Sequence, residues 1–111
     1  MGDMAALIYG LKNCDTCRKA LKALPEAKLV DVRADGLPGG LLDRAFEQFG
    51  ATVLNTRSTT WRGLSDGEKA GDPTAMISTH PALMKRPLIA IGNSLFLGWN
   101  KEIERDVQAL L

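Results

Sequence analysis

The first third of the chain contains a strand, a helix and a second strand in close succession, and this order constrains the fold more than any other feature. Residues 5–9, Ala-Ala-Leu-Ile-Tyr, are a short apolar run that ends at Gly10 and is typical of a buried strand. Residues 15–24 repeat apolar side chains at helical spacing and stop before Pro25, and residues 29–32 are a second strand-like run. A helix between two such strands predicts a right-handed crossover, so the strands form a parallel pair.

The last quarter of the chain predicts an antiparallel hairpin followed by a helix. Residues 88–91 and 94–97 are apolar runs joined by Gly92-Asn93, a two-residue turn. Asn100 is placed to cap a final helix. The crossover pair and the hairpin together predict an α/β fold of the thioredoxin-like kind, with a four-stranded mixed sheet. A doubly wound fold needs more parallel strands than this length provides.

The middle of the chain is less regular. A loop at residues 36–40 precedes a predicted helix over residues 41–49, and the stretch to residue 86 is mainly helical but broken by glycines and prolines. At 111 residues the chain is too short for two domains that fold independently. We therefore expect one domain over residues 1–111, with a helical insertion at about residues 39–86 between the second and third strands.

Charge and hydropathy exclude several classes of protein. Lys and Arg number 14 against 13 Asp and Glu, so no strong field favours direct nucleic-acid binding. The apolar runs are too short to span a bilayer, and the first residues, Met-Gly-Asp-Met-Ala-Ala, lack a basic segment leading into an apolar one. We expect a cytoplasmic protein with no membrane partner.

Both cysteines lie where the first strand gives way to the first helix, in the segment GLKNCDTCRKAL at residues 10–21. A structural disulfide is not expected, because the cytosol is reducing and a bridge over so few residues restrains little chain. A zinc site is not expected either, because His80 is the only histidine and no third cysteine completes a ligand set. A reactive thiol remains.

Cys14 is the better candidate nucleophile. A thiolate at a helix N-terminus is stabilised by unpaired backbone N-H groups and the helix dipole, and such sites lower a cysteine pKa from about 8.5 to about 3.5–7.5. Arg18, four residues on, adds a positive charge on the same side of the first turn. Cys17 is either a resolving thiol or an ordinary core residue on the apolar face of the helix, and the spacing leaves both open.

Three stretches of the sequence resemble a known family. They are IYGLKNCDTCRKAL at residues 8–21, VLNTRSTTWRGL at residues 53–64 and HPALMKRPLI at residues 80–89. In this order they are similar to the ArsC/Spx family, and most of all to its YffB-type, arsenate-reductase-like members. The resemblance covers nearly the whole chain. It implies a thioredoxin-like fold with a helical insertion.

The resemblance also implies roles for individual residues. Cys14 matches the nucleophilic cysteine, Arg18 the basic residue of the first turn, and Arg86 the arginine before the proline that starts the third strand. Pro87 matches a proline that is usually cis in this fold. Another arginine of the site lies in the family's middle stretch, where this chain has Arg57 and Arg62; five residues apart on a helix, these two are not expected to point the same way.

A thiolate among arginines suits an anionic partner, because guanidinium groups bind oxyanions and carboxylates with two hydrogen bonds. The resemblance implies two substrates, arsenate and glutathione, with glutaredoxin as a further partner and no tightly bound cofactor. The chain differs from established arsenate reductases, which have serine where this chain has Cys17 and a further arginine in the region where it has only Lys101. We therefore expect a thiol-dependent reductase that uses glutathione and turns over arsenate slowly.

A second reading comes from the Cys-x-x-Cys spacing, which is similar to that of the Spx regulators. There the pair is a redox switch on a protein that binds the RNA polymerase alpha subunit. Gly50 falls near the glycine that helps this contact in Spx. The alternative function is thus a redox-sensing regulator of transcription rather than an enzyme.

Overall fold

The computed structural model describes residues 6–110. Two expectations lie outside this range. One is residue 5 as part of the first strand, and the other is the absence of a targeting segment in the first residues. The chain divides into two compact units: one comprises the chain up to Asp35 and from Arg86 onward, and the other comprises residues 36–85. The insertion was predicted at about residues 39–86, and the second unit spans residues 36–85. No helix among residues 6–110 is long and apolar enough to cross a membrane.

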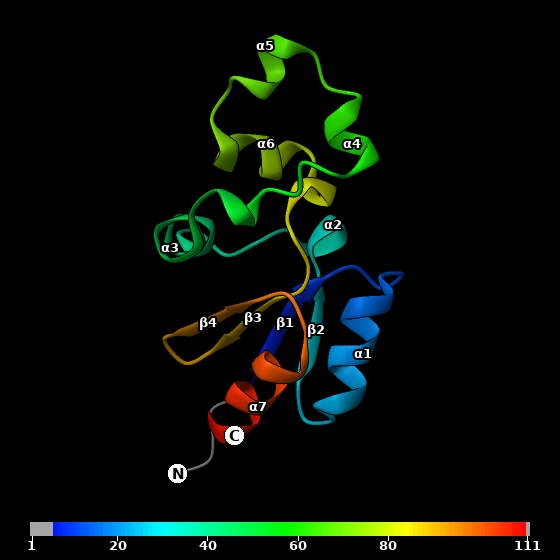
Figure 1. The fold of residues 1–111 in the computed structure, drawn as a ribbon, viewed down its shortest axis with the longest axis vertical. Helices are drawn as coiled ribbons and strands as arrows, with labels where there is room; N and C mark the ends of the chain where they lie inside the picture. The colour runs from blue at the N-terminus through cyan, green and yellow to red at the C-terminus, as the bar shows by residue number, and fades with distance from the viewer. Residues whose placement is uncertain (1–5, 111) are drawn as a thin grey trace. The chain divides into compact units, whose positions relative to one another are not determined.

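The first unit is built on a four-stranded sheet (Figure 1). Its strands are β1 (Ala6–Gly10), β2 (Lys28–Asp31), β3 (Leu88–Ile91) and β4 (Ser94–Leu97), in the order β2-β1-β3-β4. β1 and β2 are parallel, whereas β3 pairs antiparallel with β1 and with β4. The mixed sheet, the crossover and the hairpin are therefore confirmed, and the fold is thioredoxin-like.

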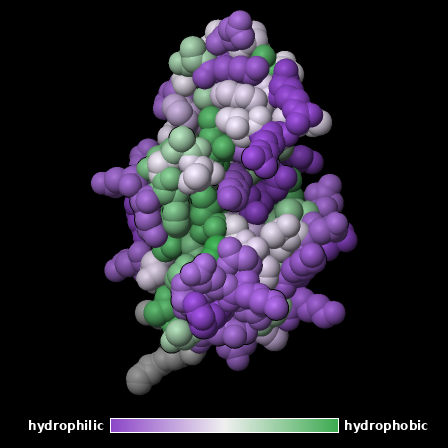
Figure 2. All heavy atoms as spheres, in the orientation of Figure 1, coloured by the Kyte–Doolittle hydropathy of each residue, from purple (hydrophilic) through white to green (hydrophobic). Residues whose placement is uncertain are grey.

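Two helices of this unit share one hydrophobic core with the sheet. They are α1 (Asp15–Ala23) and α7 (Lys101–Leu110). In the sheet, Ile8 lies opposite Ile89 and Ala6 opposite Ile91, which places these four apolar side chains on one face. The core cluster joins them to Ala20 and Leu24 at α1 and to Val107 of α7. The outer face of α7 is hydrophilic (Figure 2), as the pattern of an amphipathic helix requires.

The ends of both long helices follow from the sequence. α1 ends before Pro25, which lacks the N-H that a helix interior needs. Asn100 caps α7 as predicted, because its Oδ1 accepts a hydrogen bond from the N-H of Ile103 at 2.8 Å.

The second strand ends one residue earlier than predicted. Val32, expected in the strand, is the first residue of a short helix, α2 (Val32–Asp35). The reason is a local cap: Asp31 Oδ1 accepts hydrogen bonds from the N-H groups of Arg33 at 2.9 Å and Ala34 at 3.2 Å. A carboxylate that satisfies these two N-H groups favours a helical turn over continuation of the strand.

The second unit is a set of short helices. They are α3 (Leu41–Phe49), the 3₁₀ turn η1 (Gly50–Val53), α4 (Thr59–Arg62), α5 (Asp66–Lys69), α6 (Pro73–Thr79) and the 3₁₀ turn η2 (Pro81–Leu83). The predicted helix over residues 41–49 is present with the predicted ends. Backbone hydrogen bonds join the middle of this unit to its C-terminal end: the Asn55 N-H donates to the Leu83 carbonyl at 2.6 Å, and the Lys85 N-H donates to the Val53 carbonyl at 2.7 Å.

Candidate active site

Cys14 lies at the N-terminus of α1. It is the N-cap residue, with φ −94° and ψ 119°, and it is partly exposed. Its carbonyl accepts the hydrogen bond of the Arg18 N-H at 3.0 Å, and its own N-H donates to the Leu11 carbonyl at 3.1 Å. The side chain of an N-cap residue stands beside the unpaired N-H groups of the first turn. The sulfur is therefore where a helix N-terminus favours negative charge.

The surroundings of Cys14 favour its thiolate. Burial raises the pKa of the Cys14 thiol, but hydrogen bonds from the Cys17 side chain, the Cys17 N-H and the Arg86 guanidinium, together with the charge of Arg86, outweigh burial and hold that pKa below its ordinary value. These donors converge on one sulfur. Hydrogen bonds to the charged form are among the strongest means of lowering a pKa.

Cys17 has the opposite character. It is fully buried on the inner face of α1. Burial, together with its hydrogen bond to Cys14 and the nearby charge of that sulfur, raises the pKa of Cys17 to about 12. Cys17 therefore keeps its proton at neutral pH and donates it in a hydrogen bond to the Cys14 sulfur. Sequence reasoning left open whether Cys17 is a structural or a resolving residue; it is buried like a core residue, yet its sulfur contacts the sulfur of Cys14.

Gly10, at the end of β1, makes room for Cys17. A Cβ added at Gly10 would overlap the Cys17 sulfur and would lie 3.3 Å from its Cβ. Only glycine lets the end of the strand approach the first turn of α1 this closely. From the sequence, Gly10 was expected only to end the strand, although a glycine just before a cysteine pair could have indicated this close contact.

Arg86 and Pro87 lie on the other side of Cys14. The peptide bond between them is cis, as the resemblance implied for Pro87. Pro87 is fully buried, and its carbonyl accepts a hydrogen bond from the Gly98 N-H at 2.8 Å, just after β4. Arg86 is partly buried and donates a hydrogen bond to the Cys14 sulfur. The structure thus brings Arg86 to the nucleophile.

Arg18 lies on the first turn of α1 but has a different contact. Its side chain is exposed, and its Nε donates to the carbonyl of Lys12 at 2.9 Å. Arg18 therefore closes the loop that leads from β1 into the helix. Its catalytic role stays a prediction.

Arg57 and Arg62 belong to the second unit, and both are exposed. The N-H of Arg57 donates to Asn55 Oδ1 at 3.2 Å in the turn before α4, whereas Arg62 is the last residue of that helix. The two arginines thus lie at opposite ends of α4. Their part in substrate binding remains a prediction.

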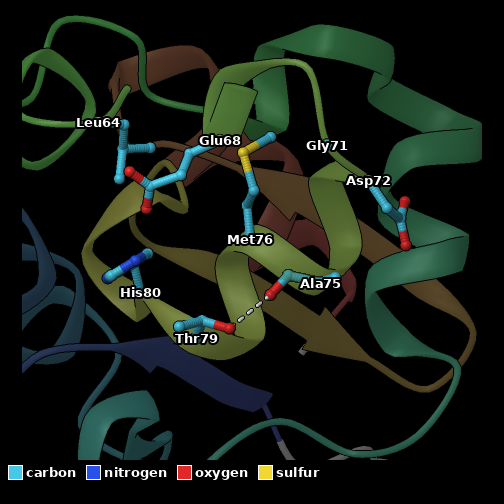
Figure 3. A pocket seen from close by; sticks show the side chains of 8 residues that line it. All are labelled: Leu64, Glu68, Gly71, Asp72, Ala75, Met76, Thr79 and His80. Atoms are coloured by element: carbon cyan, nitrogen blue, oxygen red, sulfur yellow. Dashed lines mark hydrogen bonds between the residues drawn. The ribbon is translucent and has the colours of Figure 1, made fainter. Parts of the chain in front are cut away.

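The second unit also contains a cavity of about 220 Å³ (Figure 3). The residues that line it are Leu64, Glu68, Gly71, Asp72, Ala75, Met76, Thr79 and His80. Several of its polar groups are used by the helices themselves: the Glu68 carboxylate accepts from the Ser65 N-H at 3.0 Å, and the Thr79 hydroxyl donates to the Ala75 carbonyl at 3.1 Å. Neither cysteine lines it. Within residues 6–110, no three His, Cys, Asp or Glu side chains are placed to hold a metal ion.

Three features define the class of thioredoxin-like thiol proteins: the mixed four-stranded sheet, a thiol with a lowered pKa at the N-terminus of the first helix, and a cis-proline directly before β3. Within this class the chain belongs to the ArsC family, whose family model matches residues 9–107. A protein of Haemophilus influenzae is 45% identical over 92% of this chain and 95% of its own length.

Solved structures agree with this assignment. The YFFB protein is 30% identical with a TM-score of 0.79, covering 96% of this chain and 98% of its own. An arsenate reductase (ArsC) related protein from Brucella melitensis is 28% identical with a TM-score of 0.69, covering 96% of each chain. The family and these neighbours are those of arsenate-reductase-like, thiol-dependent proteins.

Proposed function

We propose that the protein is a thiol-dependent oxidoreductase in which Cys14 is the nucleophile and glutathione is the co-substrate. The observation that carries this proposal is the divergence of two neighbouring thiols. Burial first, and then the hydrogen bond that it donates to Cys14, raise the pKa of Cys17 to about 12, whereas hydrogen bonds from Cys17 and Arg86 outweigh burial and lower the pKa of Cys14. One sulfur is thus prepared to attack, and the other to hold a proton.

The reaction is a thiol–disulfide exchange. The Cys14 thiolate attacks one sulfur of a disulfide that contains glutathione; a bond forms between Cys14 and that sulfur, and the other sulfur leaves as a thiolate that takes up a proton from solvent. A second thiol, from glutathione or glutaredoxin, then attacks as its thiolate the sulfur bound to Cys14; a new disulfide forms between these two sulfurs, and Cys14 leaves as a thiolate. The guanidinium of Arg86, already directed at Cys14, is suited to the negative charge of a glutathione carboxylate or an arsenate oxygen.

The experiment is a pH-dependent alkylation of the reduced protein, with the Cys14 peptide followed by mass spectrometry. We expect Cys14 to react with a midpoint below the ordinary thiol pKa of about 8.5. Incubation with oxidised glutathione should then place glutathione on Cys14, and a coupled assay with glutathione and glutaredoxin should show turnover. A Cys14 that titrates at its ordinary value and forms no mixed disulfide would refute the proposal.

The contact between the two sulfurs also supports the competing proposal of a redox-sensing regulator, because two neighbouring thiols can be oxidised to a disulfide. For such a regulator, oxidation would close the Cys14–Cys17 disulfide and change binding to the RNA polymerase alpha subunit. Binding of purified alpha subunit to the reduced and oxidised protein tests this. Turnover without any such binding favours the enzyme, and binding without turnover favours the regulator.

A further inference from the structure

Glycine lies on both sides of Pro87 at the end of the sheet nearest the two cysteines. The antiparallel registers of β1 with β3 and of β3 with β4, continued by one residue beyond their last pairs, place Gly10 and Gly98 on either side of Pro87. A Cβ on Gly10 would overlap the Cys17 sulfur, so this row of backbone lies directly against the cysteine pair. A movement of Pro87 is therefore a movement beside the cysteines.

One ladder hydrogen bond joins Pro87 to Gly98. Proline has no N-H, so of the two backbone hydrogen bonds that an antiparallel pair of residues can exchange, only the one from the Gly98 N-H to the Pro87 carbonyl can form. It is present at 2.8 Å, and both residues are buried. Because water does not compete for a buried bond of this kind, it fixes the position of Pro87 against the end of β4.

Gly98 makes this bond from a backbone conformation that a side chain disfavours. Its φ is +86°, in a region that glycine occupies freely and other residues rarely adopt. The chain here leaves β4 for α7 (Figure 1), where Trp99 packs on the core cluster and Asn100 caps the helix. Since the chain is anchored on both sides of Gly98, a residue that moves this φ to a negative value must tilt the preceding peptide and draw its N-H away from Pro87.

We infer that Gly98 is a positioning residue of the active site: its N-H holds the Pro87 carbonyl and so keeps the preceding residue, Arg86, beside the cysteines. Gly98 has no side chain that could bind a substrate, so it acts through the backbone alone. What it places is the Arg86 guanidinium, one of the donors to the Cys14 sulfur. The inference deepens the proposed function and rests on it, since it requires Cys14 to be the reactive thiolate.

The test is the midpoint of Cys14 alkylation against pH in Gly98→Ala and in a matched control. We expect Gly98→Ala to raise the midpoint by about half a pH unit, because a displaced guanidinium keeps only part of its attraction to the thiolate. In the control, Gly92→Ala, the glycine also has a positive φ, +57°, but it lies in the turn at the other end of β3 and β4. This variant should lose stability without moving the midpoint. An unmoved midpoint in Gly98→Ala, or equal shifts in both variants, would overturn the inference.

A double variant tests the route through Arg86. Arg86→Ala alone should raise the midpoint by about one unit, because a hydrogen bond and a positive charge are lost. Where Gly98 acts by placing this guanidinium, Gly98→Ala has nothing left to displace, so the double variant should stay within about 0.2 of Arg86→Ala. A double variant that shows the sum of the two single shifts would contradict the inference, because Gly98 would then affect the sulfur by another route.

Hydrogen exchange in the wild type decides the matter even where Gly98→Ala does not fold. A bond that fixes Pro87 opens only when the sheet unfolds, so the Gly98 amide should exchange within about tenfold of the rate of Ile89, which is fully buried in β3. Faster exchange at Gly98 would show local opening and overturn the inference. A wild-type Cys14 that titrates at its ordinary value would instead refute the proposed function, and the inference with it.

Discussion

At the scale of single residues, the site depends on which atoms donate to one sulfur. The Cys17 side chain, the Cys17 N-H and the Arg86 guanidinium all hydrogen-bond to Cys14. The N-H stays in place whichever residue occupies position 17, so substitutions at that position test the thiol donor alone. Substitutions at position 86 test the charged donor.

Replacing Cys17 should change the acidity of Cys14 according to whether a donor remains. In Cys17→Ala the sulfur loses one hydrogen bond, and the pKa of Cys14 should rise by about one unit, since a hydrogen bond to a charged group contributes about 1.5–3 kcal/mol and solvent offsets part of it. In Cys17→Ser a hydroxyl can still donate, so the pKa should stay low. Alkylation midpoints of the two variants check this, and a rise of the same size in both would contradict it.

Replacing Arg86 should weaken both the thiolate and its affinity for anions. Arg86→Ala removes a hydrogen bond and a positive charge, so the pKa of Cys14 should rise by about one unit. Arg86→Lys keeps the charge without the planar guanidinium, so the pKa of Cys14 in this variant should lie between its values in the wild type and in Arg86→Ala. The alkylation profile measures the first effect, and the KM for a glutathione disulfide the second. An alanine variant with the wild-type profile would remove Arg86 from the site.

At the scale of elements, the contact between β1 and α1 limits what residue 10 can be. Gly10→Ala would place a methyl group against the Cys17 sulfur, and we expect a loss of about 1–3 kcal/mol in the free energy of unfolding. Cys17→Ala shortens the opposing side chain, so the double variant Gly10→Ala/Cys17→Ala should recover part of this loss. Urea unfolding of the single and double variants gives the coupling energy; strictly additive effects would show that the two side chains do not collide.

The elements that could be predicted from the sequence are those with a clear period and clear ends. α1 stops at Pro25, the hairpin turns at Gly92-Asn93, and α7 starts at Asn100, so each has a local cause that can be read from the residues. α2 was missed because four residues show no helical period; its only indication was Asp31 at the cap position.

The short helices of the second unit were predicted only as a mainly helical stretch. Single turns such as α4 and α5 are defined by their caps: Ser58 accepts from the Trp61 N-H at 3.1 Å, and Ser65 with Glu68 forms a capping box. The Ser-x-x-Glu spacing at Ser65 could have indicated the second of these starts. For the candidate site, Cys14 and Arg86 could be named from the sequence, but the contrast between the two thiols could not, because the raised pKa of Cys17 depends first on its burial in the folded chain.

At the scale of the whole molecule, the two thiols make stability depend on pH in opposite directions. The pKa of Cys14 is lowered in the folded state, so the folded protein releases this proton before the unfolded chain does. Its contribution to stability is complete above the ordinary thiol pKa and is lost as the pH falls through the lowered value. Over this window the free energy of unfolding should therefore rise with pH.

Cys17 acts in the alkaline range. Its pKa is raised from the ordinary thiol value of about 8.5 to about 12, so between these values the unfolded chain has lost a proton that the folded protein still binds. The free energy of unfolding should then fall as the pH rises, with a slope of at most about 1.4 kcal/mol per pH unit for one proton. Together the thiols predict a contribution to stability that is greatest near the ordinary thiol pKa.

Urea unfolding of the reduced protein at pH values from 6 to about 11, repeated for Cys17→Ala and Cys14→Ala, checks this prediction. Other groups also titrate in this range, so the informative quantity is the difference between the wild type and each variant. The free energy of unfolding of the wild type minus that of Cys17→Ala should decrease above about pH 9, because only the wild type carries the buried thiol that keeps its proton in the folded state. The free energy of unfolding of the wild type minus that of Cys14→Ala should increase from about pH 6 toward pH 9, because only the wild type forms the Cys14 thiolate that the folded state stabilises. Differences that stay constant with pH would show that both sulfurs titrate alike in the folded and unfolded states, and the division between an attacking and a proton-holding thiol would be wrong.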